Sequence, residues 1–176
     1  MTDHKHILIC GEVGAGKSML IQRLLRQNSR PLYGFITKKL DSDENGFHPI
    51  YIHPAGAKTR VWEQDNMIGT CDRRTHNINL NVFNTLGVSY LQAKPDGIII
   101  MDELGFMESK ADTFVKSVLT ALDGEIPVIA AVKARFDVPF LNEVRAHPKT
   151  VLNMITTENR DTLFSELLPI IQGWKG

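Results

Sequence analysis

The sequence contains little cysteine, no excess of either charge and no long apolar run. Its 176 residues include two cysteines, Cys10 and Cys71, which form no C-x-x-C pair. Such spacing argues against a disulfide framework and a thiolate metal site, and it favours a reducing compartment. No run of about 18 apolar residues could span a bilayer, and the apolar stretch at residues 7–10 is too short for a signal peptide. We therefore expect a cytoplasmic protein with no membrane partner.

Charge of one sign is also lacking. Twenty Lys and Arg residues balance twenty Asp and Glu residues, so the formal net charge is +0. A neutral chain has no overall attraction for nucleic acid, which we do not expect as a partner, and any anion must be held by a local site. The six histidines, among them His6, His48 and His53, have no neighbouring cluster of zinc ligands. We expect the histidines at the surface.

Length and composition fit one globular domain. A chain of 176 residues has room for a single core of ordinary size. With 43% hydrophobic and 23% charged residues, its composition differs from that of disordered chains, which bury too little apolar surface to fold. We predict that residues 1–176 form one domain.

The first half of the chain reads as strand, glycine loop, helix and then a β-rich insertion. Residues 6–10 are strand-like, and helical periodicity starts at Lys17 and ends before Pro31. Residues 34–37 and 47–53 are strand-like pieces on either side of Asp43-Glu-Asn-Gly46, a composition typical of a hairpin turn. We predict a β-rich insertion over residues 31–75.

The second half alternates helices and strands. The pattern predicts helices over about 79–91, 112–122 and 138–147, and strands over 97–101, 127–132 and 151–155. A final helix is expected from about Glu158, with Thr157 as its N-cap. The apolar runs at 97–101 and 127–132 are typical of strands buried on both faces. The predicted fold class is α/β, a mainly parallel sheet with helices on both faces.

One glycine-rich segment carries a phosphate-binding pattern. Residues 11–18 fit G-x-x-x-x-G-K-[ST], the P-loop or Walker A motif, between a predicted strand and a predicted helix. Glycines let backbone N–H groups turn toward phosphate oxygens, and the helix start adds its positive dipole. Lys17 would contact the β- and γ-phosphates, while the Ser18 hydroxyl would ligate Mg²⁺. The predicted nucleotide-binding residues are Gly11, Glu12, Val13, Gly14, Ala15, Gly16, Lys17, Ser18 and Met19.

An acidic pair follows the apolar run at 97–101. Asp102 and Glu103 stand at the carboxyl end of a buried strand, where open α/β sheets form their ligand crevice. We expect Asp102 to hold Mg²⁺ together with Ser18. Successive residues of a strand point to opposite sides, so Glu103 should be aimed differently and reach the attacking water as a general base. Lys17 and Glu103 are the predicted catalytic residues.

Several other cations are weaker candidates. Arg135, Arg145 and Arg160 could each stabilise transition-state charge, although a solvated surface role is expected for any single arginine. Lys133 follows the predicted strand at 127–132 and could approach the γ-phosphate from a neighbouring strand end.

With these motifs in place, the chain resembles the THEP1 family of nucleoside-triphosphatases, P-loop proteins related to the RecA-like ATPases. The resemblance rests on residues 11–18, 34–37, 102–108 and 157–161, which occur in the family's order. It implies slow, Mg²⁺-dependent hydrolysis of ATP, GTP and other nucleoside triphosphates to diphosphates. It also implies the roles given above for Lys17, Ser18, Asp102 and Glu103.

The chain departs from the family pattern in two places. Lys38 and Lys39 stand where acidic residues are usual, and Phe106 stands where a lysine is usual. These changes of charge bear on substrate preference and on any contact made by these segments.

Two other functions stay open from the residues alone. A small nucleoside or nucleotide kinase would use the β-rich insertion to hold a phosphoryl acceptor, but a water-activating Glu beside a metal-binding Asp counts against that class. A non-catalytic nucleotide-dependent switch is suggested by Asp102-Glu-Leu-Gly105, which matches the D-x-x-G of GTPases. The N-K-x-D element that reads guanine is absent from the sequence.

Overall fold

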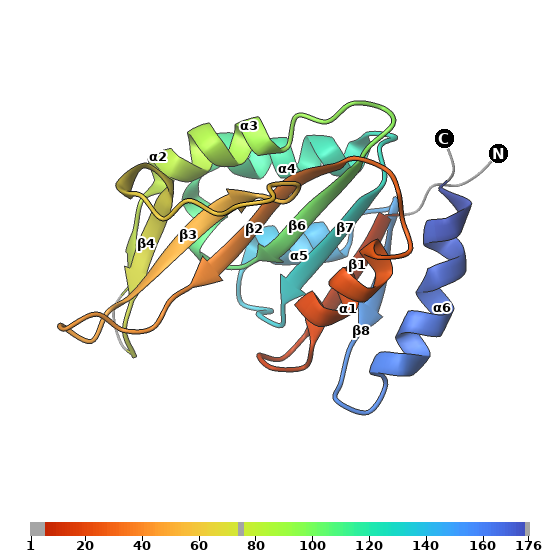
Figure 1. Ribbon diagram of the computed structural model, residues 1–176, viewed down its shortest axis with the longest axis horizontal. Helices are drawn as coiled ribbons and strands as arrows, with labels where there is room; N and C mark the ends of the chain where they lie inside the picture. Colours follow the sequence, from red (N-terminus) through yellow and green to blue (C-terminus); the bar gives the residue numbers. More distant parts are fainter. Residues whose placement is uncertain (1–5, 74–75, 175–176) are drawn as a thin grey trace.

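One eight-stranded sheet organises the protein. The computed structural model describes residues 6–73 and 76–174, and within them the strand order is β5-β4-β3-β2-β6-β7-β1-β8 (Figure 1). The five strands from β2 to β8 in this order are parallel to one another. The predicted α/β fold with a mainly parallel sheet is confirmed. These strands are β1 (His6–Gly11), β2 (Leu32–Lys39), β6 (Ile98–Leu104), β7 (Val128–Lys133) and β8 (Thr150–Met154).

The β-rich insertion predicted over residues 31–75 begins later than expected, because its first strand, β2, pairs in parallel with β6 in the main sheet. The strands that follow β2 extend the same sheet in antiparallel orientation. These are β3 (His48–Pro54), β4 (Met67–Cys71) and β5 (His76–Ile78). The turn between β2 and β3 forms where the sequence predicts it, because Asp43 Oδ1 accepts hydrogen bonds from the N–H groups of Asn45 and Phe47. Thr75, the predicted end of the insertion, lies outside the described residues.

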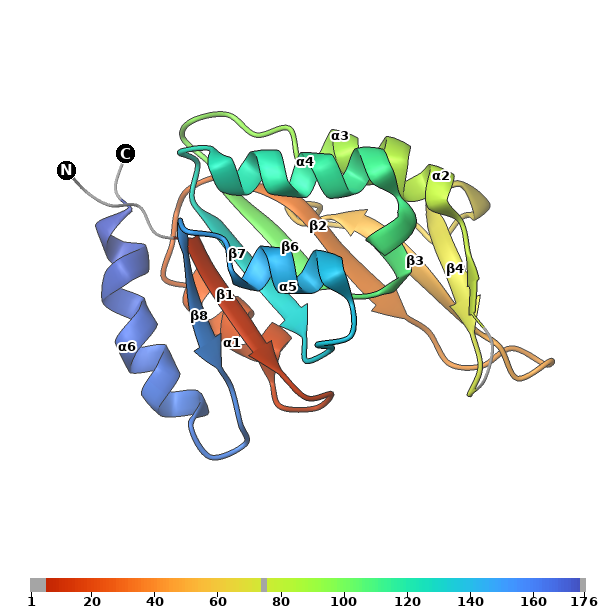
Figure 2. The ribbon, with the colours of Figure 1, turned by 180° about the vertical axis from the view of Figure 1, so that it is seen from behind.

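Helices cover both faces of the sheet, as predicted. Helices α1 (Lys17–Leu25) and α6 (Arg160–Gly173) pack on one face. The other face carries a helical run at 80–90, together with α4 (Asp112–Asp123) and α5 (Pro139–Arg145). Figure 2 shows α4 and α5 in front of the strands and α1 behind them. The run at 80–90 consists of α2 (Leu80–Val82), a π-helical turn (Phe83–Gly87) and α3 (Val88–Tyr90).

The first four residues of β6, 98–101, are all apolar, and their burial explains why. Ile98 and Ile100 belong to the core beneath α1 and α6, whereas Ile99 and Met101 belong to the core on the opposite face. Successive side chains of a strand point to opposite faces, so a strand covered by helices on both sides needs apolar residues at every position. The prediction that this run is buried on both faces is confirmed.

The last helix begins later than predicted. Helix α6 starts at Arg160, and Asn159 rather than Thr157 occupies its N-cap position. Asn159 Oδ1 accepts a hydrogen bond from the N–H of Thr156 at 2.7 Å, and its Nδ2 donates to the C=O of Met154 at 2.8 Å. These two bonds hold the preceding residues in a turn, so the expected N-cap at Thr157 is wrong.

Two expectations from composition have different outcomes. Cys10 and Cys71 are both free and buried, so they form no disulfide. The expected surface position of the histidines is wrong for His6 and His53, which are 0% and 2% exposed. His53 packs edge-on against Trp62, with ring centroids 4.6 Å apart.

In the two described ranges of the chain, no helix has the length and apolar character needed to cross a membrane.

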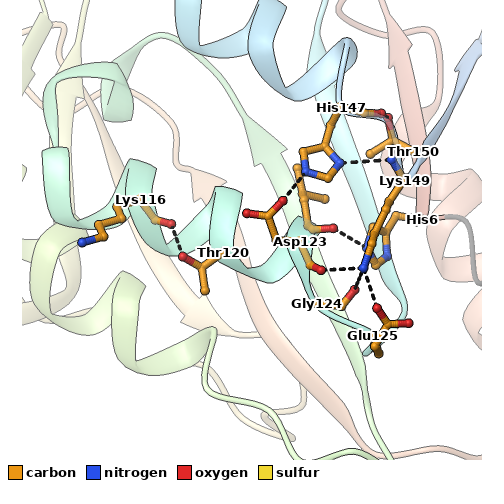
Figure 3. A network of polar contacts seen from close by, with 10 residues as sticks. His6, Lys116, Thr120, Asp123, Gly124, Glu125, His147, Lys149 and Thr150 are labelled. Carbon is orange, nitrogen blue, oxygen red and sulfur yellow. Dashed lines mark hydrogen bonds and ion pairs between the residues drawn. The ribbon is translucent and has the colours of Figure 1, made fainter.

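His6 ties the start of β1 to the end of α4. Its Nδ1 accepts a hydrogen bond from the N–H of Val128 at 3.2 Å, and its Nε2 lies 2.8 Å from the C=O of Leu122. A carbonyl can only accept, so Nε2 carries the proton and the ring is neutral. Burial is the main reason that the pKa of His6 is lowered. The Leu122 carbonyl opposes the shift, and the charges of His147, Lys149 and Glu125 act on it less strongly (Figure 3).

We expect the free energy of unfolding to fall as the pH drops below about 6.5, the ordinary pKa of histidine. The unfolded chain then binds a proton at His6 that the folded protein excludes, so folding loses stability as pH decreases. The His6→Leu variant should lose about 2 kcal/mol near neutral pH, because the N–H of Val128 and the C=O of Leu122 lose their partners. Its further loss on acidification should be smaller than that of the native protein.

Urea unfolding at several pH values measures both effects. The control is His48→Leu, a histidine on the more exposed β3. An identical pH dependence of stability in the native and His6→Leu proteins would show that His6 does not couple folding to protonation.

Candidate active site

The P-loop leaves β1 at Gly11 and enters α1 at Lys17. Gly14 and Gly16 have positive φ angles of 80° and 102°, which glycine adopts without the clash that a Cβ atom causes. No side chain of the described residues caps the start of α1. The free N–H groups and the positive end of the helix dipole can therefore face an anion.

Lys17 lies at the base of this loop. It is 7% exposed, and its Nζ donates hydrogen bonds to the C=O of Gly11 at 2.7 Å and of Glu12 at 3.1 Å. The same Nζ lies 3.5 Å from Oε2 of Glu103. The ammonium group is thus held between backbone carbonyls and a carboxylate from β6, and it faces the space above the loop.

Ser18 and Asp102 meet across the sheet although 84 positions separate them. The Ser18 hydroxyl donates to Oδ1 of Asp102 at 2.9 Å. Burial, the main cause, raises the pKa of Asp102, and the hydrogen bond from Ser18 opposes the shift. Among charged neighbours, Glu103 raises this pKa further while Lys38 and Lys17 lower it. Because of the 2.9 Å contact between them, the two predicted metal ligands form a compact pair of oxygen donors.

Glu103 lines the same cleft as Asp102. Its carboxylate lies between two cations, with Oε2 at 3.5 Å from Lys17 Nζ and Oε1 at 3.7 Å from Lys133 Nζ. The expectation that the two acids are aimed to opposite sides of the strand is wrong. The pairing register of β6 with β7 shifts between Asp102 and Leu104, so the regular alternation of the strand is interrupted at Glu103.

These groups enclose a cleft of about 360 Å³. Of the nine predicted nucleotide-binding residues, the cleft is lined by Val13, Gly14, Gly16, Lys17, Ser18 and Met19, and it also contains Asp102 and Glu103. The other three do not line the cleft. The C=O of Glu12 accepts hydrogen bonds from the N–H of Ala15 and from Lys17 Nζ, Ala15 is buried, and Gly11 lies where a Cβ would be 2.7 Å from Ile155.

The weaker candidate cations have different places. Lys133 contacts Glu103, as described above. Arg160 donates from Nε to the C=O of Ala15 at 2.7 Å and from Nη2 to the C=O of Gly14 at 3.0 Å, so it holds the P-loop. Two arginines serve the segment after β7 instead. Arg145 binds the carbonyls of Lys133 and Arg135, and Arg135 pairs with Asp137 at the surface.

Sequence reasoning missed two residues near the acidic pair. Thr37 of β2 lines the cleft, and its hydroxyl lies 3.3 Å from the C=O of Asp102 and 3.4 Å from the N–H of Glu103. Glu108 is 3% exposed and accepts a hydrogen bond from the N–H of Gly105. Both residues stand in the segments that carry the family resemblance, which was the one signal available for them.

Comparison with known proteins decides the family. The NTPase family, whose members are described as NTPases, matches this chain over residues 6–168. The chain belongs to this NTPase family. The match includes the P-loop and the acidic pair that form the cleft.

Curated relatives of this NTPase carry one name. The nucleoside-triphosphatase THEP1 of Aquifex aeolicus is 28% identical over 182 residues, covering 94% of this chain and 98% of the relative. THEP1 of Thermotoga maritima is 28% identical over 176 residues, covering 97% of each. The resemblance to the THEP1 family is thus confirmed, and the enzyme class is that of a nucleoside-triphosphatase.

Solved structures agree with this assignment. The crystal structure of Aquifex aeolicus THEP1 superposes on the NTPase with a TM-score of 0.72 and 26% identity, covering 95% of this chain and 99% of that one. The solution structure of a human cancer-related nucleoside triphosphatase shares the fold, with a TM-score of 0.69 and 16% identity over 98% and 100% of the two chains.

Arg160→Gln should weaken nucleotide binding about tenfold, because the carbonyls of Gly14 and Ala15 lose charged donors that hold the P-loop in shape. Calorimetric titration with a non-hydrolysable ATP analogue measures the affinity. Arg23→Gln is the matched control, since Arg23 joins α1 to α6 through an exposed pair with Asp161 that does not touch the loop. Equal affinities of the two variants would refute this role of Arg160.

Proposed function

We propose that this NTPase binds Mg²⁺ complexes of ATP, GTP and other nucleoside triphosphates in the P-loop cleft and hydrolyses the terminal phosphate there. The observation that carries the proposal is the 2.9 Å contact between Ser18 and Asp102, with Glu103 beside it. It brings a metal-binding oxygen pair and a second acid to the mouth of an anion-binding loop. The proposed site residues are those predicted above, with Thr37 and Arg160 added.

The donor set at Ser18 and Asp102 fits Mg²⁺. Both donors are oxygens, as Mg²⁺ prefers, and one carboxylate with a hydroxyl leaves room for waters and substrate phosphates. No group of three or more His, Cys, Asp or Glu residues within the described ranges could hold a metal ion alone. Such a partial site suits an ion that arrives with its nucleotide. When bound, Mg²⁺ neutralises charge that develops on the β- and γ-phosphate oxygens.

The chain's own groups then have separate tasks. The N–H groups at the start of α1 bind phosphate oxygens, and Lys17 Nζ stabilises the negative charge that moves toward the leaving diphosphate. The Glu103 carboxylate, fixed between Lys17 and Lys133, orients water and accepts its proton. Thr37 steadies the backbone at the junction of Asp102 and Glu103.

A cytoplasmic location stays a prediction that rests on the two buried, unpaired cysteines.

Glu103→Gln should reduce phosphate release from ATP and GTP by about a hundredfold or more while nucleotide affinity changes little, because the amide keeps the shape but cannot accept the proton. Phosphate release across ATP, GTP, CTP and UTP measures the effect. Glu143→Gln, on the exposed face of α5, is the control. Full activity of Glu103→Gln would remove this residue from the reaction.

Lys17→Ala and the removal of Mg²⁺ by a chelator should each abolish most phosphate release, since both withdraw positive charge from the transferring group. Asp102→Asn should shift the Mg²⁺ requirement upward by about tenfold or more, because the site loses its one charged ligand. Titration of activity against Mg²⁺ distinguishes the two variants. Hydrolysis that persists in Lys17→Ala would place the active site elsewhere.

A further inference from the structure

A second cavity, of about 280 Å³, adjoins the P-loop cleft. The two share Val13, Thr37 and Glu103 in their walls, so they meet at the proposed general base. The rest of the second cavity is built by the β-rich segment, the helical run at 80–90, the residues that follow β6 and Lys133 of β7. None of these elements belongs to the P-loop, and the hydrolysis described above uses none of these residues except Lys133.

The walls of this cavity combine apolar and charged residues. Half of the lining residues are apolar, and Lys39, Lys133, Glu103 and Glu108 are charged. Ile50 and Ile68 come from β3 and β4, Phe83 comes from the helical run, and Met107 and Phe106 follow β6. The ring of Phe106 is fixed by His76, with centroids 4.8 Å apart, and by the guanidinium of Arg135 at 5.0 Å. Aromatic and aliphatic walls beside polar or charged groups are typical of sites for small organic ligands that contain a ring.

One buried acid faces this apolar space. Glu108 lines the cavity and is 3% exposed, and its carboxylate accepts a hydrogen bond from the N–H of Gly105. Burial is the main cause that raises the pKa of Glu108 to about 7. A buried carboxyl group on an apolar wall can exchange hydrogen bonds with the ring nitrogens of a heterocycle.

The second cavity meets the P-loop cleft at Glu103, whose carboxylate contacts Lys17 of the P-loop. Lys17 is the residue expected to bind the β- and γ-phosphates, so a hydroxyl group held next to Glu103 from the second cavity would lie near the γ-phosphate. Phosphoryl transfer requires such a hydroxyl group to attack in line with the departing diphosphate.

We propose that the second cavity binds a nucleoside, and that the protein transfers the γ-phosphoryl group to a nucleoside hydroxyl in competition with water. The ring would lie against Phe83 and Phe106 with its nitrogens toward Glu108, and the hydroxyl would reach Glu103. The new bond forms between the hydroxyl oxygen and the γ-phosphorus, and the bond from that phosphorus to the β–γ bridging oxygen breaks. The hydroxyl proton passes to Glu103, and the products are a nucleoside monophosphate and a nucleoside diphosphate.

This inference rests on the proposed function, because both reactions use the same P-loop and the same base. The full chain is incubated with Mg²⁺ and ATP labelled at the γ-phosphate, with adenosine, guanosine, cytidine, uridine or thymidine added separately. Chromatography separates labelled monophosphate from labelled phosphate. We expect labelled monophosphate from at least one nucleoside, with phosphate release reduced in the same reaction.

Two variants test whether the cavity holds the acceptor. Ile50→Trp fills it and should lower the ratio of transfer to hydrolysis about tenfold or more, while Val61→Trp introduces the same side chain at an exposed position and should leave the ratio unchanged. Glu108→Gln keeps the shape of the cavity and should lower the ratio about tenfold for the preferred nucleoside. It serves in place of Ile50→Trp if that variant does not fold, as judged by thermal unfolding.

The outcomes separate the two claims. Normal hydrolysis without any labelled monophosphate would overturn the acceptor site and leave the proposed function intact. Transfer that is unchanged in Ile50→Trp and in Glu108→Gln would also overturn it, because the acceptor would then bind elsewhere. Loss of both reactions in the native protein would refute the proposed function and this inference together.

Discussion

The hydrogen bond between Ser18 and Asp102 is the contact on which the whole site depends. Its two residues are 84 positions apart. Ser18 lies at the start of α1, after the loop that leaves β1, and Asp102 lies in β6; β1 and β6 are not neighbours, since β7 lies between them. The contact is possible because all three strands are parallel, so that their carboxyl ends lie at one edge of the sheet. The apolar cores on both faces fix that parallel arrangement. The packing of these cores, far from the site, thus determines where the oxygens of Ser18 and Asp102 lie.

Burial of Asp102, the first residue of the acidic pair, costs free energy of hydration, and the surrounding groups offset this cost. A carboxylate away from water loses hydration, and this loss raises the pKa of Asp102. The Ser18 hydroxyl and the lysines at 17 and 38 favour its charged form. Lys38 lies in β2 and is a departure from the family pattern. Its positive charge lowers the pKa of Asp102. Phe106, the other departure, replaces a cation by a ring that packs among cations.

The sequence was sufficient for the fold class, the order of most elements and the residues of the P-loop. Glycine positions, apolar strand runs and helical periodicity are local signals, because each involves residues that are close together in the sequence. Contacts between distant segments were not predictable in the same way. The role of Arg160 depends on the last helix meeting the first loop, and the side-by-side placement of Asp102 and Glu103 depends on a register shift. His6 was misjudged because its two backbone partners, at Leu122 and Val128, lie more than 100 positions away.

The hydrogen bonds from Arg160 to the P-loop have a consequence for the synthesis of the protein. The carbonyls of the P-loop are synthesised before the guanidinium that holds them, because that group comes from α6, 145 positions later. Synthesis proceeds from the amino terminus, so a nascent chain carries the motif long before it has the finished loop. The loop therefore reaches its mature form only after α6 has been synthesised.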